Sequence, residues 1–165
     1  MKKKTAILVD GGFFLKRYRS IYKIKSLDPI KTANDLWEMC LKHLTQAKGE
    51  NFDLYRIFYY DCSPYDKKQH NPITKKSIDF SKTYQYNFQV QFLEELKKKR
   101  KIALRLGVLE DRKRWIIRPS KTKELLSKAI SIDDLAEEDV QFDFIQKRVD
   151  IKIGLDVASM ALKRQ

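Results

Sequence analysis

An unbroken apolar run that ends at a carboxylate and two glycines constrains the fold of this chain most strongly. The segment TAILVDGGFF begins at Thr5, and its apolar residues lead directly into Asp10, Gly11 and Gly12. Because the run lacks the apolar and polar alternation of a half-exposed strand, residues 5–9 are predicted to form a short strand buried on both faces. We expect a helix to follow the glycines.

The following segments alternate between helical and strand patterns. Apolar side chains recur at helical spacing in some segments, whereas others are rich in the aromatic and β-branched residues that favour strands. The predicted helices are 32–47, 81–100 and 150–163, and the predicted strands are 52–60 and 102–109, with a hairpin through EDRKR to 115–117. This order is that of an open α/β sheet, mostly parallel and flanked by helices.

Two carboxylates end strands at the edge where such sheets bind ligands. Asp10 follows the first predicted strand and Asp61 the second, and ligands of open α/β sheets lie outside the carboxyl ends of the strands. A dinucleotide-binding glycine pattern is excluded because Phe14 and Leu15 stand where a third glycine is needed. Two roles remain for Asp10: it ligates a hard cation such as Mg²⁺ or Mn²⁺, or it only caps the next helix.

The composition favours one globular domain with a polyanionic partner. A formal net charge of +13 attracts nucleic acid, although the charge alternatively serves solubility. No apolar run approaches the roughly 20 residues that cross a bilayer, so we expect a cytoplasmic protein with no membrane partner, a single domain over residues 1–165. Cys40 and Cys62 fit neither a redox pair nor a zinc site and are expected in the core or a loop.

Three basic clusters are candidate RNA contacts. They are residues 97–101, residues 112–114 beside Trp115, and the lysines around Tyr65. Cations contact phosphates while neighbouring aromatic rings stack on bases. The alternative for each cluster is a plain solvated surface, and for Trp115 a place in the core.

The C-terminal segment QKRVDIKIGLDVASMAL places two more carboxylates in an apolar helix. Asp150 and Asp156 are separated by six residues, which leaves them roughly 120° apart around a helix axis. They therefore do not form one simple pair.

ILVDGG and QKRVDIKIGLDVASMAL resemble the first and third motifs of the NYN domain, the PIN-like ribonuclease fold that includes the LabA-type bacterial proteins. FYYD, which ends at Asp61, and LRLG, which ends at Gly107, resemble the middle strands of that family, so the likeness spans nearly the whole chain. The resemblance implies a Rossmann-like sheet, a Mg²⁺ or Mn²⁺ site and hydrolysis of RNA phosphodiester bonds. The alternative is a catalytically silent nucleic-acid-binding or assembly module that retains the fold.

The resemblance also implies the site residues. Asp10 and Asp150 are the metal-site carboxylates, and Asp156 is a further catalytic candidate. Asp61 either positions substrate or water, or only closes its strand into a loop. The other residues assigned to substrate binding are Gly11, Gly12, Arg148 and Lys152.

The chain departs from the family pattern in three places. Phe13 stands where many relatives have Asn, and Arg148 stands where a Gly is usual. The family's next strand, which supplies another metal ligand, is missing before the chain ends at Gln165. We therefore expect an incomplete domain that is nearly inactive alone, with the edge of its first strand covered by a partner chain, a swapped segment or a local rearrangement.

Overall fold

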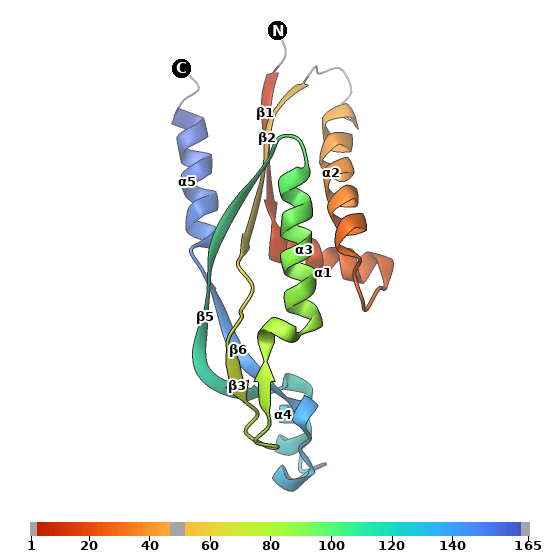
Figure 1. The fold of residues 1–165 in the computed structure, drawn as a ribbon, viewed down its shortest axis with the longest axis vertical. Helices are drawn as coiled ribbons and strands as arrows, with labels where there is room; N and C mark the ends of the chain where they lie inside the picture. Colours follow the sequence, from red (N-terminus) through yellow and green to blue (C-terminus); the bar gives the residue numbers. More distant parts are fainter. Residues whose placement is uncertain (1–2, 47–51, 163–165) are drawn as a thin grey trace.

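The computed structural model describes residues 3–46 and 52–162, and its main sheet has four strands in the order β1-β2-β5-β6 (Figure 1). The elements are β1 (Lys3–Asp10), α1 (Gly11–Tyr22), α2 (Pro29–Gln46), β2 (Phe52–Cys62), β3 (Lys68–His70), β4 (Ser77–Asp79), α3 (Tyr84–Lys98), β5 (Ile102–Ile117), α4 (Pro119–Leu126), β6 (Val140–Lys147) and α5 (Val149–Leu162), with short 3₁₀ turns at Phe80–Lys82, Ile132–Asp134 and Glu137–Asp139.

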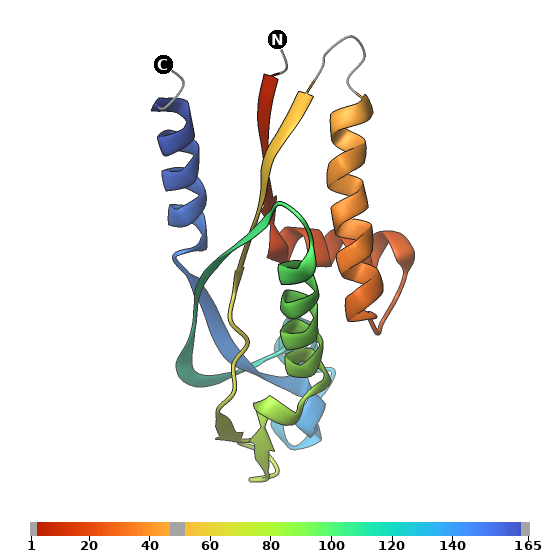
Figure 2. The same ribbon diagram turned by 45° about the horizontal axis from the view of Figure 1, so that its top comes forward.

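The sheet is mostly parallel, as predicted. β1 pairs with β2 and β2 with β5 in parallel, whereas β6 runs antiparallel to β5. Helices α1, α2 and α3 pack on one face of the sheet, and α5 packs on the other (Figures 1 and 2). The chain is therefore an α/β protein with helices on both faces of its sheet. No helix in the described residues is long and apolar enough to cross a membrane.

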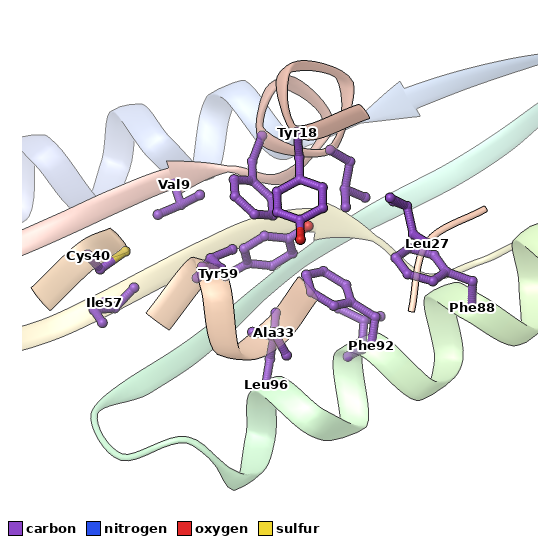
Figure 3. Close-up of a cluster of buried hydrophobic side chains, with 14 residues drawn as sticks. Val9, Tyr18, Leu27, Ala33, Cys40, Ile57, Tyr59, Phe88, Phe92 and Leu96 are labelled. Atoms are coloured by element: carbon purple, nitrogen blue, oxygen red, sulfur yellow. The ribbon is translucent and has the colours of Figure 1, made fainter. Parts of the chain in front are cut away.

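The larger hydrophobic core lies between the sheet and helices α1 to α3 (Figure 3). Tyr59 of β2 is fully buried at its centre and meets Phe92 of α3 edge-on, with ring centroids 5.6 Å apart. Leu96 and Cys40 are fully buried in the same cluster. Cys62 is buried on the opposite face of the sheet. Both cysteines are therefore buried, as expected, and neither forms a disulfide.

Helix α5 covers the second face and runs back along the sheet. At its start Val149 packs against Cys62, near the carboxyl end of β2, and at its end Met160 packs beside Leu8 of β1. Val157 is 50% exposed, although the helical pattern groups it with the buried side. The predicted helix ends at positions 47 and 163 lie outside the described residues.

Strand β1 packs on both faces but is only partly buried. Ile7 and Val9 contact the larger core, and Ala6 and Leu8 contact the α5 side. Within the described residues β1 pairs with β2 alone, which makes it an edge strand and explains its exposure. A groove of about 680 Å³ lies between β1 and α5. Cover of this edge by a partner chain, a swapped segment or a local rearrangement stays a prediction.

The predicted hairpin through EDRKR is wrong, because β5 continues as one strand from Ile102 to Ile117. Its second half pairs with β6, and the register shifts between Asp111 and Trp115. The extra residues form a bulge in which Lys113 has φ 52°. Arg112 and Arg114 on either side of Lys113 both bond the Asp143 carboxylate of β6, which anchors the bulge.

Helix α3 begins later than residue 81 because Thr83 caps it. The Thr83 hydroxyl accepts a hydrogen bond from the Tyr86 amide at 3.3 Å, and Phe80–Lys82 form a separate 3₁₀ turn. The short hairpin β3–β4, helix α4 and strand β6 were not predicted. Together with the far half of β5 they extend the molecule beyond the carboxyl end of β1, at the lower end of Figure 1.

Candidate functional site

Asp10 ends β1 and caps α1. Its backbone is extended, and its Oδ1 accepts a hydrogen bond from the Phe13 amide at 2.9 Å. The capping role considered from the sequence is therefore confirmed. The same bond holds the carboxylate at the carboxyl edge of the sheet, beside Gly12.

The two glycines after Asp10 have different surroundings. Gly11 is buried, and a Cβ atom there would lie 2.4 Å from the Tyr59 hydroxyl oxygen and 2.7 Å from the Tyr60 carbonyl oxygen. A Cβ on Gly12 would lie 3.5 Å from the Asp10 carboxylate and 3.8 Å from the Gln146 amide oxygen, both ordinary contacts. Gly11 therefore permits tight packing of α1 on β2, whereas Gly12 borders the open edge.

Asp61 is buried at the end of β2, only 5% exposed, and accepts three hydrogen bonds. The donors are the Tyr59 hydroxyl at 3.0 Å, the Gln89 amide at 2.7 Å and the Cys62 backbone amide at 2.7 Å. Burial raises the pKa of the Asp61 carboxyl above its usual range, the charge of Asp10 adds to the rise, and the hydrogen bonds oppose it. The Tyr59 hydroxyl that bonds Asp61 also lies against Gly11, so Asp61 is near the start of α1, where Asp10 forms the cap.

The start of α5 reaches the same edge of the sheet. Val149 packs against Cys62, and its Cγ2 lies 3.0 Å from the position of a Cβ on Gly107. Asp150 follows in the first turn of α5 and is exposed. Arg148, at the turn into the helix, has φ 70°, and its carbonyl accepts a hydrogen bond from the Lys152 amide at 3.2 Å.

Asp156 points elsewhere. Its carboxylate accepts hydrogen bonds from the Tyr60 hydroxyl at 2.8 Å and from Arg105 Nε at 2.9 Å. Both partners lie beneath α5, on the face of the sheet opposite to Asp61. The structure therefore does not bring Asp156 together with Asp10 and Asp61.

A cleft of about 370 Å³ opens at this edge. It extends from Gly12 and Asp61 to aromatic residues in the part of the molecule beyond the carboxyl end of β1. Sequence reasoning missed most of its lining, which includes Arg19, Phe80, Gln85, Tyr86, Gln89, Phe144 and Gln146. The spacing of Gln85 and Gln89, one turn apart in α3, was an available signal.

No protein-family model, curated protein or solved structure matches this chain. The chemistry of the site therefore rests on its own geometry.

The carboxylates fit a hard cation in kind but form no complete cage. Across residues 3–46 and 52–162, no group of three or more His, Cys, Asp or Glu side chains is placed to hold a metal ion. Mg²⁺ commonly binds one or two carboxylates and completes its shell with water and substrate phosphate. The Asp10 cap uses Oδ1, so Oδ2 has the chemistry of such a ligand, and Asp150 is a second exposed carboxylate, in the first turn of α5.

Many cations of the basic clusters have acceptors within the protein. Lys97 and Lys98 pair with glutamates one turn earlier in α3, and Lys99 bonds Asn34. Arg112 and Arg114 share Asp143. These exposed pairs are weak, so phosphate groups compete for the same cations.

Proposed function

We propose that this chain is a PIN-like ribonuclease of the NYN class that hydrolyses RNA phosphodiester bonds in a metal-dependent reaction. The observation that supports the proposal is that β1 and β2 end with Asp10 and Asp61 at the carboxyl edge of a mostly parallel sheet, and that α5, with Asp150 in its first turn, begins near that edge. That edge is where open α/β sheets bind ligands.

Asp10 and Asp150 would hold Mg²⁺ or Mn²⁺, which when bound supplies charge neutralisation at the scissile phosphate and activation of water. The cap bond from Phe13 fixes the Asp10 carboxylate in place before substrate arrives. Asp61 serves mainly as a buried anchor, because its two oxygens already accept three hydrogen bonds. It orients Gln89 in the wall of the cleft.

The net charge of +13 supports a polyanionic substrate over a small neutral metabolite. Neutralised phosphates release counterions, so binding of RNA is expected to weaken steeply with salt. We propose that the RNA is encountered in the cytoplasm.

A catalytically silent RNA-binding module is the second candidate. It is favoured by the lack of a three-ligand metal cluster in the part of the chain that the structure describes. The saturation of Asp61 by hydrogen-bond donors points the same way.

Divalent metal separates the two candidates. The chain is incubated with end-labelled single-stranded and hairpin RNA in Mn²⁺, in Mg²⁺ and in EDTA, and products are resolved on a denaturing gel. The ribonuclease proposal expects cleavage with metal that EDTA abolishes and that Asp10→Asn removes. Retention of RNA in a filter-binding assay with no cleavage in either metal would instead establish the binding module.

A further inference from the structure

We propose that the cleft beside Asp61 binds one unstacked nucleobase of a single-stranded RNA. The ligand class rests on the proposed function, whereas the shape and lining of the cleft are independent of it. The cleft, about 370 Å³, falls within the roughly 300–1,000 Å³ of ordinary small-ligand sites. Its lining combines aromatic rings, side-chain amides and one guanidinium group, from Arg19.

Two phenylalanine rings form a rigid corner in this cleft. Phe80 and Phe144 lie with centroids 5.4 Å apart and planes at 86°, and both are half-buried. Tyr65 packs against both rings, at 5.4 Å from Phe80 and 4.9 Å from Phe144. Because each ring is braced by another, the two rings need little reorganisation to receive a base.

The Tyr65 ring is itself fixed by hydrogen bonds. Its hydroxyl donates to the Asp111 carboxylate at 2.7 Å and accepts from the Gln69 amide at 2.7 Å. Asp111 lies in β5 next to the bulge that pairs with β6. The unpredicted strand β6 therefore lines the cleft through Phe144, and the β5 segment beside the bulge holds Tyr65 in place.

The side-chain amides of three glutamines also line the cleft. Gln89 donates through Nε2 to the buried Asp61, which orients its Oε1 as an acceptor. Gln85 lies one turn earlier on the same helix and is exposed, and Gln146 stands beside Gly12. Base edges carry both donors and acceptors, and a glutamine amide matches such an edge with one of each.

The position of the cleft links base binding to the strand-end carboxylates. Its lining includes Gly12 and Asp61 at one end and Phe80 and Phe144 at the other. In this proposal the sugar and phosphate of the stacked base lie toward Gly12, beside the Asp10 carboxylate. Arg19, half-buried in the last turn of α1, supplies positive charge to the lining.

Base dependence is measured by fluorescence anisotropy in EDTA, so that cleavage plays no part. The probes are labelled eight-nucleotide RNAs of each base, an abasic ribose-phosphate strand of the same length, and a duplex. Stacking of one base on an aromatic side chain is worth about 1–3 kcal/mol, so we expect the best RNA to bind at least about fivefold tighter than the abasic strand. Competition by a nucleoside monophosphate tests whether the free nucleotide occupies the same cleft.

Variants locate the base in the cleft. Phe144→Leu and Gln85→Ala are each expected to reduce the advantage of RNA over the abasic strand several-fold. Gln91→Ala is the matched control for Gln85, because Gln91 is exposed on the same helix but does not line the cleft. Tyr55→Leu is the aromatic control, since Tyr55 is 53% exposed on β2 and also lies outside it.

Equal affinity for RNA and the abasic strand overturns the proposal. So does an equal loss in Gln85→Ala and Gln91→Ala. If Phe144→Leu unfolds, the exposed Gln85 still decides the outcome. Base-dependent binding without Mn²⁺-dependent cleavage keeps the base site and removes the ribonuclease proposal, whereas cleavage without base dependence does the reverse.

Discussion

The hydroxyl of Tyr59 lies 3.0 Å from the carboxylate of Asp61, two residues along the same strand. Tyr59 is fully buried, and burial raises the pKa of its hydroxyl well above the usual range, so it stays a neutral donor. The same hydroxyl oxygen stands 2.4 Å from where a Cβ on Gly11 would lie. One tyrosine thus connects the core, the start of α1 and the buried acid of the cleft.

Asp61→Asn is expected to change how stability depends on pH. The folded-state pKa of Asp61 is raised above its unfolded value, so the folded protein binds more protons between the two values. This contribution to stability is full below the unfolded pKa of about 4 and is lost as pH rises through the folded pKa. Because Asn does not titrate, the free energy of unfolding of the variant should gain on that of the wild type as pH rises through this window.

Urea unfolding from about pH 2.5 to 8 measures that difference, and Asp143→Asn provides a control of opposite sign. A hydrogen bond from Arg114 holds the pKa of Asp143 below its usual range, so its contribution is present above the unfolded pKa and lost as pH falls. Parallel curves for wild type and Asp61→Asn would show that Asp61 has an ordinary pKa in the folded protein.

The adjacent Gly11 and Gly12 should respond very differently to the same substitution. In Gly11→Ala the new methyl group meets the buried Tyr59 ring and the Tyr60 carbonyl, and overpacking of this kind should lower the free energy of unfolding by about 2 kcal/mol or more. Gly12→Ala makes only ordinary contacts in a helix, and its effect should stay below about 1 kcal/mol. Thermal and urea unfolding check both, and equal stability of the two variants would refute the packing role of Gly11.

The sequence was sufficient for the parallel half of the fold. Apolar patterns predicted β1, β2 and the start of β5 together with α2, α3 and α5, because each buries a continuous face in a core. The position of Asp10 and Asp61 at one edge followed from strand order alone. The position of Asp156 away from that edge could not be predicted from the sequence. Its partner Arg105 lies in β5, and only the tertiary fold brings β5 near α5.

The extension that lines the cleft was missed, although part of it left a signal. Val140, Phe142 and Phe144 alternate with polar Gln141 and Asp143, the period of a half-exposed strand. EDRKR was predicted to be the turn of a hairpin, whereas in the fold Arg112 and Arg114 bond Asp143 across the bulge. Pairing between strands so distant in sequence is not encoded locally.

Arg148→Gly is expected to stabilise the protein. Arg148 has φ 70°, a left-handed conformation that costs a residue with a side chain about 1–2 kcal/mol relative to glycine. Since glycine also gains freedom in the unfolded chain, the net increase in unfolding free energy should be about 0.5–1 kcal/mol. Arg148→Ala removes the same charge without relieving the backbone, so a gain in both variants would mean that charge, and not conformation, is responsible. RNA affinity of the two variants, measured in parallel, tests the assignment of Arg148 to substrate binding.

The three candidate carboxylates, Asp10, Asp150 and Asp156, should differ in their effect on cleavage when each is replaced by asparagine. Asp10→Asn keeps a good helix cap, so its unfolding free energy should change by less than about 1 kcal/mol. Loss of a carboxylate ligand should nevertheless lower Mn²⁺-dependent RNA cleavage about 100-fold or more, and Asp150→Asn should do the same. Asp156→Asn weakens a partly exposed pair with Arg105, which predicts a stability loss below about 1 kcal/mol and near-normal cleavage.

Single-turnover cleavage rates in Mn²⁺, with circular dichroism to confirm folding, decide between these outcomes. Wild-type rates in Asp10→Asn or Asp150→Asn would remove that residue from the site, and a loss confined to Asp156→Asn would move the chemistry to the α5 face of the sheet.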